Sequence, residues 1–210
     1  MNVSINCYLV RINKGFILID TGRSNKRKVI EKELEKADCH TGDLKLIVLT
    51  HGDFDHNGNA AYFRKKFETK IAMHKDDSGM IEHGNMLFNR NNQNIFTKII
   101  SKLLFKLSKS DRVKPDLYID EGYDFSVYGF EAKVLEIPGH SQGSIGILTS
   151  TGELFCGDLL ANLKKPDMWS IIDNSDAAVV SIKKLKSLQI TTVYPGHGKP
   201  FPFEQFVKTH

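Results

Sequence analysis

Residues 50–59 read THGDFDHNGN and directly follow the apolar run 46–49, which is typical of a buried strand. Within this stretch four ionisable side chains occupy six consecutive positions: His51, Asp53, Asp55 and His56. A short loop that begins at His51 can fold back and direct all of them to one point, an arrangement that suits a metal ion. A solvated surface loop is the alternative interpretation, and the rest of the chain decides between the two.

Three later strand ends carry residues of the same kind. Each of the segments 138–140 (PGH), 157–158 (GD) and 195–197 (PGH) places one potential ligand beside a glycine and after an apolar run. Together with the first stretch they supply seven nitrogen or oxygen donors: His51, Asp53, Asp55, His56, His140, Asp158 and His197. Imidazole and carboxylate ligands in this mixture suit zinc, iron or manganese. The sequence therefore predicts a metal site with enough donors for two ions that share one carboxylate.

Apolar runs and helical spacing alternate along the chain, which indicates an α/β protein. Residues 8–12 and 16–19 flank Asn13-Lys14-Gly15 and are typical of a β-hairpin. Further strands are predicted at 46–49, 70–73, 118–119, 125–127, 130–137, 143–149, 153–156 and 192–194, and helices at 24–36, 59–67 and 176–188. In each half of the chain a strand-rich part precedes an alternating part, so we expect two similar halves with partly parallel sheets.

Length and composition favour one compact domain that spans residues 1–210. The chain is 40% hydrophobic and has a net charge of +4, which does not favour a nucleic-acid binder. Its three cysteines show no CxxC spacing, so we expect no disulfide framework and a reducing, cytoplasmic location. Polar residues interrupt the N-terminal stretch, and the sequence predicts neither a signal peptide nor a stable membrane association.

The ordered set of short motifs resembles the metallo-β-lactamase-fold hydrolase superfamily over essentially the whole chain. These motifs are Asp20-Thr21-Gly22, THGDFDH at 50–56, PGH at 138–140, GD at 157–158 and PGHG at 195–198. Any one of them would be weak evidence, whereas five in this order are specific. The resemblance implies a four-layer αββα sandwich with the site at one edge, between the two sheets.

The resemblance also implies a role for each candidate residue. His51, residue 53 and His140 would hold a first metal ion, Asp55, His56 and His197 a second, and Asp158 would bridge the two. Asp20 is expected behind the site, where it would orient a histidine ligand or fix the surrounding loop. Asp55 and Asp158 are the candidate catalytic residues, with Asp55 orienting the attacking hydroxide and taking up its proton.

The chain departs from the superfamily's His-x-His-x-Asp-His signature at one residue, because Asp53 stands where the second histidine is expected. With histidine there, two divalent metals, two carboxylates and one hydroxide carry a formal charge of +1, and with Asp53 the charge is zero. Such a centre polarises water less and moves the metal preference from zinc, the first expectation, towards manganese or iron. The alternative is that Asp53 is too short to reach, which would leave the first metal site weak or empty.

Together these features predict a hydrolase in which a metal-bound hydroxide cleaves an ester, thioester, lactone or phosphoester of a small molecule. A second interpretation is a di-iron oxidoreductase that uses a separate electron donor, because flavodiiron reductases resemble this pattern and carry Glu at the position of Asp53. A third is a non-catalytic binding module on the same fold. The sequence identifies no substrate-binding residue.

Residues 78–115 are the part least like the superfamily, and we interpret them as a helical insertion. Apolar residues between 95 and 107 recur at helical spacing, while Lys98, Lys102 and Lys106 share another face. The insertion has a net charge of +5, so a lid formed by it would attract an anionic substrate. The other interpretations are a helix packed on the sandwich with solvated lysines, and transient docking on an anionic membrane.

Overall fold

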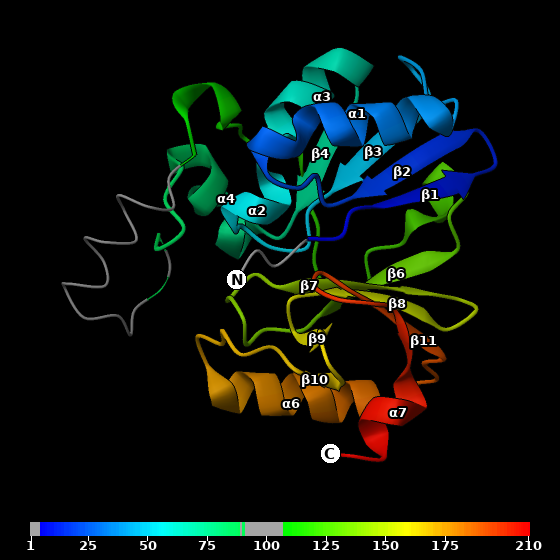
Figure 1. Ribbon diagram of the computed structural model, residues 1–210, viewed down its shortest axis with the longest axis vertical. Helices are drawn as coiled ribbons and strands as arrows, with labels where there is room; N and C mark the ends of the chain where they lie inside the picture. Colours follow the sequence, from blue (N-terminus) through cyan, green and yellow to red (C-terminus); the bar gives the residue numbers. More distant parts are fainter. Residues whose placement is uncertain (1–4, 89, 91–106) are drawn as a thin grey trace.

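The computed structural model describes residues 5–88, 90 and 107–210, which form two facing β-sheets with helices on their outer sides (Figure 1). The first sheet has the order β1-β2-β3-β4-β5: Tyr8–Ile12, Gly15–Ile19, Leu44–Val48, Lys70–Met73 and Leu117–Tyr118. The second has the order β12-β11-β8-β7-β6: Phe201–Pro202, Thr192–Pro195, Glu153–Gly157, Ile145–Thr149 and Ala132–Glu136. A separate antiparallel pair consists of β9 (Leu160–Asn162) and β10 (Pro166–Met168).

Both sheets contain parallel strands, as the alternating pattern predicted. In the first sheet β1 and β2 pair antiparallel, whereas β3 pairs in parallel with β2 and β4. In the second sheet β8 and β11 are parallel, and the other neighbours are antiparallel. Parallel neighbours end at the same sheet edge, so β2 with β3, and β8 with β11, deliver the residues that follow them to a common place.

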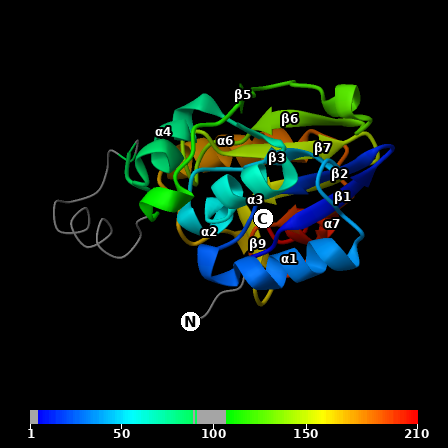
Figure 2. The same ribbon diagram turned by 90° about the horizontal axis from the view of Figure 1, so that it is seen from above.

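Helices complete the four-layer sandwich that the resemblance to the superfamily implied. The first sheet is covered by α1 (Arg27–Lys36) and α3 (Ala60–Phe67), as Figure 2 shows from above. The second is covered by α6 (Ser175–Lys186) and α7 (Phe203–Val207). Within the described ranges the other helical elements are α2 (Phe54–Asn57), α4 (Lys75–His83) and the 3₁₀ helices η1 (Ser24–Lys26), η2 (Lys109–Asp111) and η3 (Phe125–Tyr128).

The strand β2 shows why the strand segments are continuously apolar. Ile17 and Ile19 belong to the core between the two sheets, whereas Phe16 and Leu18 pack under the helices of the first sheet. Side chains alternate across a strand, so a strand covered on both faces needs an apolar residue at every position. Burial of a side chain of this size stabilises the fold by about 1.5–3 kcal/mol.

One predicted strand is wrong, because residues 125–127 lie in the 3₁₀ helix η3. The Asp124 side chain caps this helix by accepting a hydrogen bond from the Ser126 backbone N–H at 2.9 Å. Phe125 is fully buried, while Val127 is 79% exposed. The side-chain hydrogen bond of Asp124 stabilises a local turn, and this turn already buries the Phe125 ring. The segment therefore forms a turn and does not pair as a strand.

Residues 89 and 91–106 of the predicted insertion, which include Lys98, Lys102 and Lys106, lie outside the described residues. Its first residues belong to α4, and at its other end Leu107 packs under the helices of the first sheet. Asp111 there forms an ion pair with Arg27 at 3.0 Å. Among the described helices, none has both the length and the apolar character needed to cross a bilayer.

Candidate metal centre

The candidate ligands come from loops that the paired strands bring to one edge of the sandwich. Asp20 follows β2 and His51 follows β3, and these two strands are parallel neighbours. Asp158 follows β8 and His197 follows β11, the parallel neighbours of the second sheet. His140 follows β6 at the edge of that sheet. Strand pairing, and not nearness in sequence, therefore assembles the site.

Internal hydrogen bonds hold the loop after β3 in its turn. Helix α2 begins directly after Asp53, and the Asn57 side-chain amide donates to the carbonyl oxygens of Gly52 and Asp53 at 2.7 and 2.8 Å. The Asn59 side-chain amide donates to the carbonyl oxygen of Thr21 at 2.8 Å. The loop is thereby fixed both internally and to the residues that follow β2.

Two groups of potential ligand atoms lie in the described part of the chain. Within each group the atoms all lie within 4.8 Å of one another: His51, His140 and Asp158 in the first, and Asp55, His56 and His197 in the second. Asp158 belongs to the first group, and its carboxylate also faces the second, because its Oδ1 is 3.3 Å from His56 Nε2 and its Oδ2 is 3.2 Å from His197 Nε2. This is the placement expected of a ligand shared by two metal ions.

Asp20 lies behind two of the histidines and sets their orientation. His56 Nδ1 donates to Asp20 Oδ2 at 2.8 Å. The Thr50 hydroxyl also donates to Oδ2, at 2.8 Å, and the Thr50 backbone N–H donates to Oδ1 at 2.9 Å. His51 Nδ1 in turn lies 3.0 Å from that hydroxyl, which can accept its proton. One buried carboxylate thus fixes His56 directly and His51 through Thr50.

Three of the candidate ligand atoms in the described structure have no hydrogen-bond partner, and their chemistry tests whether a metal ion fits the site. His140 Nδ1 donates to the carbonyl oxygen of Ile171 at 2.6 Å, so in this ring too the lone pair is on Nε2. Among the described residues, Nε2 of His51, Nε2 of His56 and Oδ1 of Asp158 are buried and accept no hydrogen bond. Unpaired buried acceptors are unfavourable, and a cation among them would satisfy all three. The residues present therefore fit divalent metal ions.

The electrostatics point the same way. Burial raises the pKa of a carboxyl group, but His56 and His197 outweigh it at Asp158 and hold the pKa of Asp158 well below its usual value. Burial lowers the pKa of His56, but Asp158 and Asp20 outweigh it and raise that pKa well above its usual value. A proton and a metal ion therefore compete for the position between His56 and Asp158.

We expect the substitution Gly196→Ala to disrupt this centre. An added Cβ would lie 2.2 Å from Asp158 Oδ1 and 2.7 Å from His56 Cε1, closer than real Cβ contacts come. The variant should keep its circular dichroism spectrum but lose most of its bound metal, measured by mass spectrometry of the purified protein. Gly42→Ala is the control for strain away from the centre, because a Cβ there meets nothing within 4 Å while its φ of 87° strains an alanine backbone. Full metal content in the Gly196 variant would contradict the expectation.

Comparison with known proteins identifies the family. The sequence profile described as the metallo-beta-lactamase superfamily matches residues 2–197. The chain belongs to this superfamily. This confirms the resemblance seen in the motifs and accounts for the position of the ligand groups at the edge of the αββα sandwich.

The individual relatives share less than 30% of their residues with this chain. The probable metallo-hydrolase YqjP of Bacillus subtilis is 27% identical over 220 residues, which cover 92% of this chain and 66% of the relative. The hydroxyacylglutathione hydrolase GloC of Haemophilus influenzae is 29% identical over 158 residues, which cover 74% of this chain and 66% of GloC. The chain thus spans just under two thirds of the length of either curated relative. The crystal structure of TTHA1623 in a di-iron-bound form has a TM-score of 0.76 at 24% identity, and the match covers 100% of this chain and 96% of that one.

Asp53, the residue that departs from the superfamily signature, lies beside the first ligand group. Its Oδ2 is 3.1 Å from His140 Nε2 and 4.0 Å from His51 Nε2. Its Oδ1 accepts a hydrogen bond from Arg90 Nη2 at 2.9 Å. Burial opposes ionisation, but Arg90 and His140 outweigh it and hold the pKa of Asp53 well below its usual value. The carboxylate is therefore charged and contacts His140, although the first ligand group of His51, His140 and Asp158 does not include it.

Sequence reasoning missed three residues that support the site. Arg90 lies in the segment that we interpreted as an insertion, where nothing in the sequence connects it with Asp53. Asp77 is fully buried and accepts hydrogen bonds from the backbone N–H groups of Gly52 and Gly143, at 2.8 Å each. It thereby ties the loop after β3 to the loop after His140. Trp169 stacks on the ring of His197, with ring centroids 4.6 Å apart.

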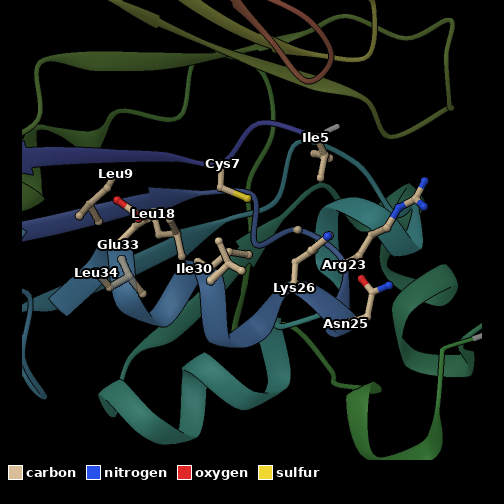
Figure 3. A pocket seen from close by; sticks show the side chains of 12 residues that line it. Ile5, Cys7, Leu9, Leu18, Arg23, Asn25, Lys26, Ile30, Glu33 and Leu34 are labelled. Carbon is tan, nitrogen blue, oxygen red and sulfur yellow. The ribbon is translucent and has the colours of Figure 1, made fainter. Parts of the chain in front are cut away.

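A pocket of about 550 Å³ lies between α1 and the strands β1 and β2 (Figure 3). Its lining is mainly apolar: Ile5, Cys7, Leu9, Leu18, Val29, Ile30 and Leu34. Arg23 and Lys26 lie at one end of it, as Figure 3 shows. Arg23 Nη2 is also 3.5 Å from Asp55 Oδ2, so this side chain connects the pocket with the second ligand group.

Proposed function

We propose that this protein is a metal-dependent hydrolase that cleaves an ester, thioester, lactone or phosphoester bond of a small molecule at a binuclear centre. The observation that carries the proposal is the placement of Asp158, whose carboxylate belongs to one ligand group and faces two histidines of the other. The relatives named as hydrolases support this general chemistry. Bound divalent metals would supply an activated water and polarise the bond to be cleaved.

The side chains divide the remaining work. His51, His140 and Asp53 would hold one metal ion, His56, His197 and Asp55 the other, and Asp158 both. Asp55 Oδ2 lies 3.8 Å from His197 Nε2, and its side chain is 13% exposed, so solvent reaches this carboxylate. We assign to the Asp55 carboxylate the orientation of the attacking water and the uptake of its proton. Asp20, behind His51 and His56, keeps both rings in their ligating orientation.

Zinc is the metal that we propose first, with manganese or iron as the alternatives that Asp53 allows. The di-iron form of TTHA1623 is a fold-level precedent for iron in this sandwich. We also propose a cytoplasmic location, because the free thiols of Cys7, Cys39 and Cys156 suit a reducing compartment.

The experiment that tests the function is a hydrolysis screen on metal-loaded protein. Zinc-, manganese- and iron-loaded samples are incubated with chromogenic carboxylic esters, thioesters, lactones and phosphodiesters. Turnover of at least one class above the metal-only background supports the proposal, and no turnover by protein that contains two metals per chain contradicts it.

A di-iron oxidoreductase is the second candidate, and the carboxylate at position 53 is the observation in its favour. Metal analysis of protein purified without oxygen separates the two candidates. A di-iron centre with a visible charge-transfer band and no hydrolysis favours the oxidoreductase, whereas colourless protein with hydrolytic activity favours the hydrolase. A protein that binds metal but has neither activity would favour the third interpretation, a non-catalytic binding module.

Substrate charge is a further part of the proposal, and Arg23 supplies the test. This cation lies between Asp55 and the apolar pocket, and its side chain is 37% exposed. We expect Arg23→Gln to raise KM for an anionic substrate about two- to fivefold, the range for a partly exposed charge, with little change for a neutral analogue. Arg64→Gln, at another partly exposed ion pair, is the matched control. Equal KM changes for both substrates would argue against an anionic substrate.

A further inference from the structure

Arg90 is a buried cation whose two ends are held by two different aspartates. Its Nη2 donates to Asp53 and its Nε lies 2.6 Å from Asp173 Oδ2. The residue is 8% exposed. Arginine is seldom buried to this extent unless it is paired, because the desolvation of a guanidinium is unfavourable. The pairing with Asp53 is therefore a built feature of the site and not a surface contact.

Arg90 changes the charge of the first ligand group. Asp53 adds one negative charge where the superfamily signature has a neutral histidine, and this alone would lower the formal charge of the centre. Arg90 adds one positive charge in direct contact with Asp53. As a pair these two side chains are neutral, like the imidazole that they replace, and Asp173 adds a second carboxylate on the far side of the guanidinium. Arg90 thus offsets the charge of Asp53 at the contact with the first ligand group, whereas the three side chains together keep a net negative charge.

Arg90 also decides which oxygen of Asp53 is available. Because the guanidinium binds Oδ1, only Oδ2 faces the Nε2 atoms of His140 and His51. Asp173 forms an ion pair with the guanidinium on the other side, without hydrogen-bond geometry at Nε, and it lies two residues from Ile171, whose carbonyl accepts from His140 Nδ1. One short segment thus accepts a hydrogen bond from His140 and carries the second carboxylate that pairs with Arg90.

We propose that Asp53 and Arg90 act together in place of the second histidine of the signature. In this arrangement Asp53 offers a single oxygen, Oδ2, to the first metal, and Arg90 is the positioning residue that sets this oxygen and balances its charge. The proposal rests on the metal centre of the proposed function, but its test measures metal affinity, so a protein that binds zinc without hydrolysing anything still decides it.

The test is zinc affinity, measured by competition with a chromophoric chelator, in a set of variants at positions 53 and 90. Arg90→Gln should lower the affinity of one of the two zinc sites and leave the other unchanged. The expected loss is about 10- to 100-fold, the usual effect of removing a residue that orients a ligand. Arg90→Lys keeps the charge without the planar fork and should give an intermediate loss. Arg27→Gln, at the partly buried ion pair with Asp111, is the matched control and should leave zinc binding unchanged.

The double variant Asp53→His with Arg90→Gln tests whether the two residues act as a pair. It restores a neutral ligand and removes the cation that Asp53 required, so zinc affinity should return to within a few fold of the original protein. This variant leaves neither Asp53 nor Arg90 as an unpaired buried charge, so it also serves if Arg90→Gln alone fails to fold. Affinity in the double variant no better than in Arg90→Gln, or an Arg90→Gln variant that binds zinc normally, would overturn the proposal.

Discussion

Removal of the bound metal by a chelator is expected to abolish hydrolysis and to leave only the background rate. The physical reason lies in the donor set, because Nε2 of His51 and His56 and Oδ1 of Asp158 are buried acceptors without hydrogen-bond partners in the described structure. These atoms can hold a metal, but none of them can activate water as a metal does. The measurement is the rate on the best substrate of the hydrolysis screen before chelation, after chelation and after zinc is added back.

Recovery of the rate on re-addition of zinc is the essential control, since it shows that the protein was not irreversibly damaged. Thermal unfolding should also shift, because a metal that binds only the folded chain stabilises it, and chelation should therefore lower Tm. Hydrolysis that continues unchanged in metal-free protein would contradict the proposed function as a whole.

The substitution Asp20→Ala is expected to cause the largest loss of stability among the changes considered. The carboxylate accepts hydrogen bonds from the Thr50 backbone N–H, the Thr50 hydroxyl and His56 Nδ1. Each buried donor left unsatisfied is unfavourable by about 1–3 kcal/mol, so we expect a loss of roughly 3 kcal/mol or more in the free energy of unfolding. Metal affinity should fall about 10- to 100-fold, because His51 and His56 lose their orientation.

Asp38→Ala is the matched control for this prediction. Asp38 has a φ of 60°, close to the 58° of Asp20, but its side chain is 87% exposed. Both substitutions therefore place alanine in the left-handed region, and only one removes buried hydrogen bonds. Chemical denaturation curves of the two variants give the comparison. Equal losses of stability would assign the effect to backbone strain and would contradict the role of Asp20 behind the histidines.

The sequence by itself determined the fold class and the membership of the candidate site. Strands covered on both faces must be apolar at every position, so β2, β3 and β8 were visible as short apolar runs. A ligand directly after such a strand must lie at a sheet edge, which is why the glycine-flanked His140, Asp158 and His197 could be grouped with residues 51–56. The strand predicted at 125–127 was wrong because a short apolar run does not distinguish a strand from a capped 3₁₀ turn.

Only the tertiary structure decided how these residues contact one another. Asp53 is charged, close to the first ligand group and paired with Arg90, which comes from a segment 37 residues further along the chain. Asp77 and Trp169 support the site from other elements, and no local pattern marks either of them. Hydrophobic periodicity reports which face of an element is buried, whereas the pairing of a buried charge depends on which loops the packed sheets bring together. For that reason the candidate ligands that lie together could be grouped from the sequence, whereas the pairing of Asp53 with Arg90 could not.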